Sequence, residues 1–165
     1  MKGVKLLSIR TCKAIITALV AGYITMVVIN NILLPEANLA YVRHVMTMDT
    51  LPEPDAHLWR SITSPTVHII TFIIMVALEI SAALLCWIGS WRMLQQKHYR
   101  SGQTIASYGL TISMIIWFGI FFVIGGEWFL AWQTPWGGLK SSIRVVTITG
   151  FTLIFINLPE DQSIV

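Results

Sequence analysis

Charged side chains are scarce in this sequence. Only 12% of its 165 residues are Asp, Glu, Lys or Arg, whereas 55% are hydrophobic. A chain with so few charges is not expected to form a soluble domain, so the composition predicts an integral membrane protein. The net charge is only +3, and its basic residues flank apolar segments rather than forming a patch. We therefore expect no nucleic-acid partner.

Motifs typical of soluble enzymes are also missing. The sequence contains no glycine-rich phosphate loop, no Ser/His/Asp arrangement and no Cys-x-x-Cys pair. Of its two cysteines, Cys12 lies at the edge of an apolar run and Cys86 lies inside another. Neither is expected to face an oxidising compartment, so a structural disulfide is not predicted. These absences favour a protein that is not an enzyme.

Four long apolar runs organise the chain. They cover residues 14–34, 66–91, 104–125 and 142–158. The second run is about 39 Å long as a helix, which is enough to cross a bilayer with some tilt. The runs leave one sizeable loop, residues 35–65, which is too short for a separate soluble domain. The sequence thus predicts a single all-α membrane domain over residues 1–165, built as a bundle of four transmembrane helices.

The distribution of basic residues predicts the orientation of the bundle. Seven of the eleven Lys and Arg residues fall before the first run or between the second and third. The other four fall on the opposite side, together with most of the acidic residues. By the positive-inside rule, both termini are expected in the cytoplasm and loop 35–65 outside. Within this loop, apolar residues recur between 39 and 48 with helical spacing, which predicts a short helix in the membrane interface.

Glu79 is the most unusual residue of the second run. It lies near the middle of residues 66–91, where a carboxylate costs several kcal/mol unless it is protonated, paired or hydrated. At 100° per residue its face also carries His68, Met75, Ala82, Ala83 and Cys86, so we expect this face to point into the bundle. The simplest hypothesis is a protonated carboxyl that forms hydrogen bonds at similar depth, with Tyr23, Thr25, Ser113 or Thr149 as candidates. The alternative is a proton relay or a ligand-binding group.

A second group of candidate residues lies toward the outer surface. It includes three of the four histidines and most of an aromatic cluster, and its members are His44, Asp49, His57, Trp59, Arg60, His68, Glu127, Trp128, Trp132 and Arg144. His44, Asp49 and His57 contain the right atoms for a metal, but their spacing matches no known ligand pattern, so no metal site is predicted. Glu127 and Arg144 flank the same outer turn and are expected to form an ion pair. Alternatively, Trp128, Trp132 and His68 could frame a headgroup or a quinone ring.

Three strings of this sequence resemble a specific family. They are YVRHVMTMDT (41–50), WRSITSPTVH with ALEISAALLCWIGSWRML (59–68 and 77–94), and WFGIFFVIGGEWFLAWQ (117–133). They are similar to a bacterial domain-of-unknown-function family of predicted small integral membrane proteins. The resemblance covers nearly the whole chain and implies four spans in a bacterial inner membrane.

Two functional hypotheses follow from these observations. The first is a non-enzymatic accessory or stabilising subunit that binds membrane lipids and a larger membrane protein or complex, since the chain is small and lacks a catalytic set. The second is a redox or transport component that binds quinone, haem or a lipid in the outer half of the bundle. No cofactor is predicted by the sequence; a haem held by His68 and a loop histidine, or a quinone, belongs to the second hypothesis.

Overall fold

Long helices make up most of the chain that the computed structural model describes, residues 8–52 and 57–159. The principal helices are α1 (Ile9–Leu33), α2 (Pro35–Thr47), α3 (Pro65–Met93), α4 (Tyr99–Met114) with its continuation η3 (Ile115–Trp128), and α5 (Leu139–Asn157). Short 3₁₀ turns, η1 (Leu58–Arg60), η2 (Gln96–His98) and η4 (Ala131–Gln133), connect them. The described residues contain no β-strand. The all-helical fold class is therefore confirmed.

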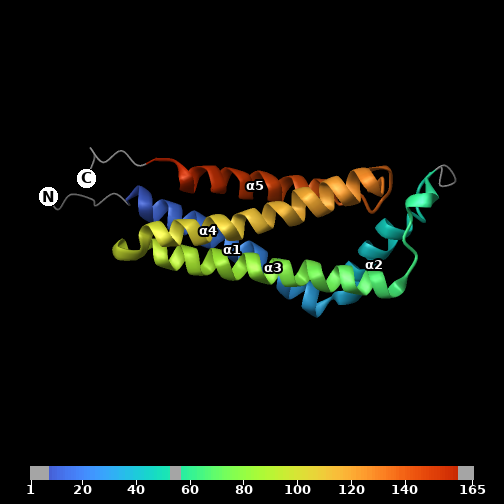
Figure 1. The fold of residues 1–165 in the computed structure, drawn as a ribbon, viewed down its shortest axis with the longest axis horizontal. Coiled ribbons are helices and arrows are strands. Elements are labelled where there is room, and N and C mark those ends of the chain that lie inside the picture. The colour runs from blue at the N-terminus through green and yellow to red at the C-terminus, as the bar shows by residue number, and fades with distance from the viewer. Residues whose placement is uncertain (1–7, 53–56, 160–165) are drawn as a thin grey trace.

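Three of these helices are long and apolar enough to cross a membrane. They are α1, α3 and the continuous helical segment Gln96–Trp128, which supports the prediction of a multi-span membrane protein. The fourth long helix, α5, has 19 residues and lies beside α4 along the bundle (Figure 1). The beginning of α1 and the end of α5 lie at the same end of the molecule, and α2 lies toward the other (Figure 1).

Small residues bring α3 and α4 into close contact. A Cβ atom added to Gly89 would lie 2.5 Å from the backbone nitrogen of Ala106, and one added to Gly102 would lie 2.6 Å from that of Met93. At Gly109 it would lie 2.7 Å from Sγ of Cys86. Such close backbone approach is the usual way in which membrane helices gain van der Waals contact. The link between the two helices, residues 94–98, is shorter than the gap between the apolar runs 66–91 and 104–125.

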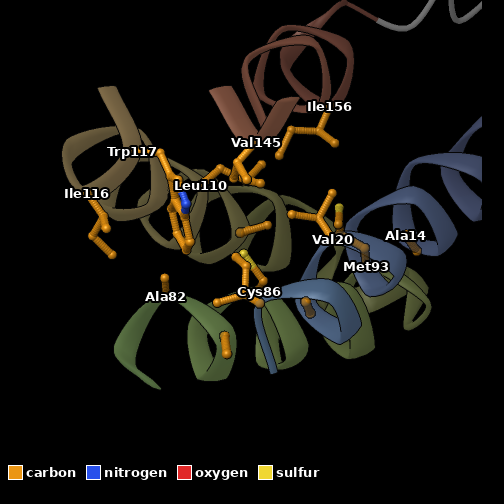
Figure 2. Close-up of a cluster of buried hydrophobic side chains, with 14 of the residues drawn as sticks. Ala14, Val20, Ala82, Cys86, Met93, Leu110, Ile116, Trp117, Val145 and Ile156 are labelled. Atoms are coloured by element: carbon orange, nitrogen blue, oxygen red, sulfur yellow. The ribbon is translucent and has the colours of Figure 1, made fainter. Parts of the chain in front are cut away.

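The core lies between α1, α3, α4 and α5. Figure 2 shows apolar side chains from all four helices meeting there, among them Val20, Cys86, Leu110 and Val145. Three long-range hydrogen bonds join the helices at the end of the bundle where α1 begins and α5 ends. Ser90 Oγ donates to Ala14 O at 2.8 Å, and Lys13 Nζ donates to Leu158 O at 2.7 Å. The Gln103 side chain donates to Ile156 O. Lys13 is fully buried and satisfies a carbonyl at the end of α5, where a cation is favourable.

The helix predicted in the first outer loop is present as α2. It begins at Pro35, earlier than the apolar pattern suggests, because proline suits the first turn of a helix. Its apolar side packs on the bundle: Val42, Val45 and Met46 join a buried cluster with Met75 and Phe129. A left-handed residue, Met48 (φ 56°), ends the helix. Its position in the membrane interface stays a prediction.

The second half of the third predicted span departs from an ordinary α-helix. From Ile115 to Trp128 the backbone is π-helical, and the bond from Phe129 N to Ile124 O (3.0 Å) closes the last wide turn. Wide turns of this kind are rare in proteins and are frequently found at functional sites. This segment, η3, forms part of the candidate site described below.

Candidate functional site

The predicted polar face of α3 points into the protein. His68, Met75, Ala82, Ala83 and Cys86 are all buried, and Glu79 is only 2% exposed. Isoleucine and leucine side chains occupy the exposed faces of the same helix. The helical periodicity therefore identified correctly the side of α3 that carries the acid.

The hydrogen-bond partner of Glu79 differs from those expected. Asn31 Nδ2 donates to Glu79 Oε2 at 2.6 Å. The four expected partners lie elsewhere: Tyr23 is exposed, the Thr25 hydroxyl bonds to Ala21 O and Trp87 Nε1, and Ser113 and Thr149 bond to each other.

The expectation was wrong because it placed the middles of all helices at one depth. Asn31 lies in the last turn of α1, which ends at Leu33, whereas Glu79 lies in the middle of the 29-residue helix α3. Glu79 therefore lies beside the end of α1. Beyond that end, α3 continues toward α2.

Glu79 lines a cavity of about 340 Å³ in this region. Residues from α1, α2, α3, η3, the turn before α5 and the first turn of α5 form its wall. Figure 1 shows these elements around the half of the molecule where α2 lies. The wall carries five aromatic side chains and a set of neutral polar groups: Tyr41, Phe72, Trp117, Phe121, Trp136, Asn31, Asn38, Ser141 and Ser142.

The electrostatic character of the cavity is set by one acid. Among the described residues that line it, none is Lys, Arg or His, and only Glu79 and Tyr41 can ionise. Burial raises the pKa of Tyr41 from 10.0 to about 12, so its phenol stays neutral at physiological pH. The carboxyl group receives a hydrogen bond on Oε2 from Asn31, which leaves Oε1 for another partner.

Tyr41 is held in place by the turn before α5. Its hydroxyl is buried without a hydrogen-bond partner in the described structure, and a Cβ atom on Gly138 would lie 2.5 Å from this oxygen. Gly138 also has a φ of +51°, which glycine adopts at little cost. Glycine is therefore favoured at 138 both by the turn and by the close approach of the Tyr41 ring.

A second, apolar cavity adjoins the first. It measures about 620 Å³ and lies between α2, α3 and η3. Tyr41, Val42, Met75 and Phe121 line both cavities and so form their shared wall. The rings of Tyr41 and Phe121 are 5.5 Å apart. A polar cavity with one acid thus lies next to a larger space lined by aliphatic and aromatic side chains.

Part of the predicted outer group assembles near the polar cavity. His44 Nδ1 lies 2.9 Å from both carboxylate oxygens of Asp49, which the left-handed turn at Met48 brings back toward α2. The imidazole ring stacks on Trp136, with the ring centres 4.4 Å apart. Because Trp136 also lines the polar cavity, the His44–Asp49 pair fixes one of its walls.

A separate cluster forms around Arg60. Its guanidinium carbon lies 5.2 Å from the Trp59 ring centre and 5.3 Å from that of Trp128, and Nη1 donates to Trp128 O at 3.2 Å. The two indoles meet edge to face at 5.9 Å. Cation–π contacts of this kind suit the boundary between lipid and water.

The remaining predicted site residues do not join either cluster. His68 is buried beneath the loop, where Nε2 bonds to Ile62 O at 2.7 Å and Nδ1 has no partner in the described structure. His57 joins no metal-ligating group, because the described residues contain no cluster of three His, Cys, Asp or Glu side chains. Trp132 is 53% exposed.

The ion pair expected between Glu127 and Arg144 is not formed. Both side chains are exposed, and the Arg144 guanidinium donates instead to Ser141 Oγ at 3.1 Å. The expectation treated the residues that flank a turn as neighbours. In fact Glu127 lies in the last turn of η3, and the turns around η4 and Gly138 separate it from α5.

A comparison of the sequence with known protein families gives a match over nearly the whole chain. The model of the family described as "Predicted small integral membrane protein (DUF2165)" matches residues 9–159. The chain belongs to this family. The resemblance noted in the three sequence strings is thereby confirmed. No curated protein and no solved structure matches the chain significantly.

Several residues of the site in this DUF2165 member were missed by sequence reasoning. Asn31, Tyr41, Trp117, Phe121 and Trp136 come from four separate segments and converge only in three dimensions. Asn30-Asn31 at the end of an apolar run was the one available signal, since an amide near a helix end in a membrane needs a partner. The aromatic residues resemble lipid-facing ones in sequence and carry no such signal.

Proposed function

We propose that the protein is a four-span protein of the bacterial inner membrane with both termini in the cytoplasm. The fourth span is α5, whose 19 residues extend about 28 Å. Two observations support this topology: the excess of Lys and Arg on one side, and the position of the beginning of α1 and the end of α5 at the same end of the bundle (Figure 1). In this orientation α2 and the cavities lie on the outer side.

We further propose that the protein functions by binding an amphiphilic molecule in these cavities. The observation that carries the proposal is a carboxyl group, 2% exposed, on the wall of a cavity of about 340 Å³ that borders an apolar cavity of about 620 Å³. Ligand sites are typically concave and mostly apolar, with a few polar groups that fix orientation. The ligand's polar part would lie beside Glu79 and its apolar part between α2 and η3.

A haem is a poor candidate for this ligand. His68 is the single histidine within the four apolar runs, but Nε2 is already hydrogen-bonded to Ile62 O and Nδ1 is covered by protein. Neither nitrogen is available to an iron atom. The lipid-binding form of the second hypothesis, as part of a transport or carrier system, therefore has better support than the haem form.

Mass spectrometry of the purified protein tests the proposal. The protein would be extracted from its native membrane in mild detergent and its bound small molecules identified. Val76 lines the polar cavity, so Val76→Trp should fill it and deplete the bound molecule. Ile73→Trp, on the exposed face of the same helix, is the matched control and should retain it. Equal retention by the two variants would contradict the proposal.

An accessory-subunit role is a second candidate, favoured by a polar stripe on α4. Tyr108 is 62% exposed, and Thr104 and Thr111 are exposed on the same side of this membrane-spanning segment. Polar side chains in membrane helices commonly contact other helices. Co-purification should then recover a membrane protein with the wild type and lose it in a Tyr108→Leu/Thr111→Val variant. Retention of the partner by this variant would exclude the stripe as the contact.

A further inference from the structure

The chemistry of the polar cavity restricts the ligand that it can hold. This inference rests on the proposed function and concerns the charge of the ligand. The described lining residues contain one carboxyl group and no cationic side chain. An anionic headgroup, such as a phosphate, would face Glu79 without any Lys or Arg to neutralise it, which is strongly unfavourable in a buried site.

A positive charge is complementary to the same wall. Cations are attracted to the faces of Trp, Tyr and Phe, and the cavity is lined by five such rings. Groups of aromatic side chains are known to recognise quaternary ammonium ligands, and a carboxylate adds a negative charge that complements a cation. The acid and the aromatic residues therefore favour the same class of ligand.

We propose that this cavity binds a lipophilic organic cation, with the cationic centre beside Glu79 and its apolar substituents against Trp117, Phe121 and Trp136. The adjoining apolar cavity, which shares the Tyr41–Phe121 wall, receives any longer apolar chain. Asn31 holds one carboxyl oxygen and leaves the other for the ligand.

The cation and a proton compete for Glu79 in this account. Binding displaces the proton from the protonated carboxyl, so that the group is neutralised by one or the other. Among the described residues that line the cavity, the other group that can ionise is Tyr41 on α2, and its phenol stays neutral. α1 contributes Val27 and Asn31, and η3 contributes Trp117 and Phe121. The charged residues nearest in sequence to the lining, Glu36, Arg43, Lys140 and Arg144, are exposed and do not line the cavity. His44 stacks on Trp136 and does not line the cavity either.

Titration of the full-length protein in detergent tests this proposal with a matched pair of probes. Tetraphenylphosphonium and tetraphenylborate have the same shape and opposite charge. Calorimetry should detect phosphonium binding that strengthens as the pH is raised, because fewer protons then compete. In weakly buffered solution the phosphonium should release up to about one proton per molecule bound. Tetraphenylborate should not bind in the cavity, so any binding of it that is detected should be the same in the wild type and in Val76→Trp.

Variants at Glu79 identify the group responsible. Glu79→Gln should weaken phosphonium binding about tenfold or more and remove its pH dependence, since a buried charge then lacks its partner. Glu79→Asp keeps the charge and should retain the pH dependence. Binding to Glu79→Gln at wild-type strength, absence of phosphonium binding to the wild type, or binding without proton release would each overturn the cation assignment.

The experiments distinguish failure of the cation assignment from failure of the proposed ligand-binding function. If Val76→Trp depletes a native amphiphile but the wild type binds no phosphonium, the cavity is a ligand site for a neutral molecule and the cation assignment alone is wrong. If Val76→Trp also leaves the native content unchanged, the proposed function is wrong as well.

Discussion

Asn31 in the last turn of α1 donates a 2.6 Å hydrogen bond to Glu79 in the middle of α3. This contact marks the level at which α1 ends while α3 continues. Beyond the end of α1, the N-terminal half of α3 is no longer covered by α1. There α2 and the turn before α5 help to enclose the polar cavity. The start of α1 packs beside the end of α3, but α1 is the shorter helix and ends beside Glu79. The cavity lies where α1 no longer covers α3.

The first prediction concerns the stability of the Asn31–Glu79 contact. Glu79→Gln should be tolerated, because the amide can still accept the bond from Asn31. Glu79→Leu should cost about 0.6 kcal/mol for the lost interhelical bond. Thermal unfolding in detergent measures both, and Asn31→Leu combined with Glu79→Leu forms a double-mutant cycle. Strictly additive losses in that cycle would show that the two side chains do not interact.

The second prediction concerns the close approach of α3 and α4. Gly109→Ala should destabilise the protein by about 1–3 kcal/mol, because the new methyl group meets Cys86 and the backbone of Ala82 at less than 3 Å. Gly119→Ala is the control, since nothing lies within 4 Å of the added atom. Denaturation in a mixed detergent would compare them. Equal stability of the two variants would be inconsistent with the observed helix contact.

The third prediction follows from the raised pKa of Tyr41, about 12 against an ordinary 10.0. In the folded protein this phenol keeps its proton to higher pH than in the unfolded chain, so its contribution to stability is complete below pH 10 and is lost as the pH rises toward 12. Tyr41→Phe should reduce the loss of stability over that window. It should also remove a phenol that titrates above pH 10 from the absorbance near 295 nm. An unchanged alkaline titration would contradict the burial of the hydroxyl.

The fourth prediction concerns topology. In a variant with Cys12→Ser and Cys86→Ala, single cysteines at Trp132 and Lys140 should react with a membrane-impermeant reagent added outside intact cells, and one at Lys97 should not. All three positions are exposed in the structure. Glu53 and Gln162, which the sequence also suggests as outer and inner positions, lie outside the described residues. External labelling at Lys97 would reverse the orientation.

The sequence predicted the membrane class because this class depends on composition and on the length of apolar runs. It predicted the buried face of α3 because that face depends on periodicity within one segment. Spacing alone placed Glu79 with Met75 and Cys86, and the structure buries all three. It could not predict Asn31 as the partner of Glu79, because the relative shift of α1 and α3 is set by where each helix ends and by contacts such as Ser90 with Ala14.

The other features that the sequence did not predict depend on the backbone path and on contacts between distant segments. The pairing of Glu127 with Arg144 was inferred from nearness to one turn, and the turn holds them apart. The π-helical backbone of η3 leaves no periodic signal, since residues 115–126 are apolar on all sides. A tryptophan in a Trp-rich turn is typical of an interfacial anchor. Trp136 instead stacks on His44 and lines the cavity.

Protection of a thiol inside the cavity is the most direct test of the central claim, that the space beside Glu79 is an accessible ligand site. In the background without native cysteines, Val76→Cys would be labelled with a small maleimide, and Trp132→Cys, exposed outside the cavity, would serve as the control. The account predicts that tetraphenylphosphonium slows labelling at position 76 several-fold and leaves position 132 unchanged. A native amphiphile recovered from the wild type should give the same protection. Equal labelling rates at position 76 with and without both molecules would contradict the account.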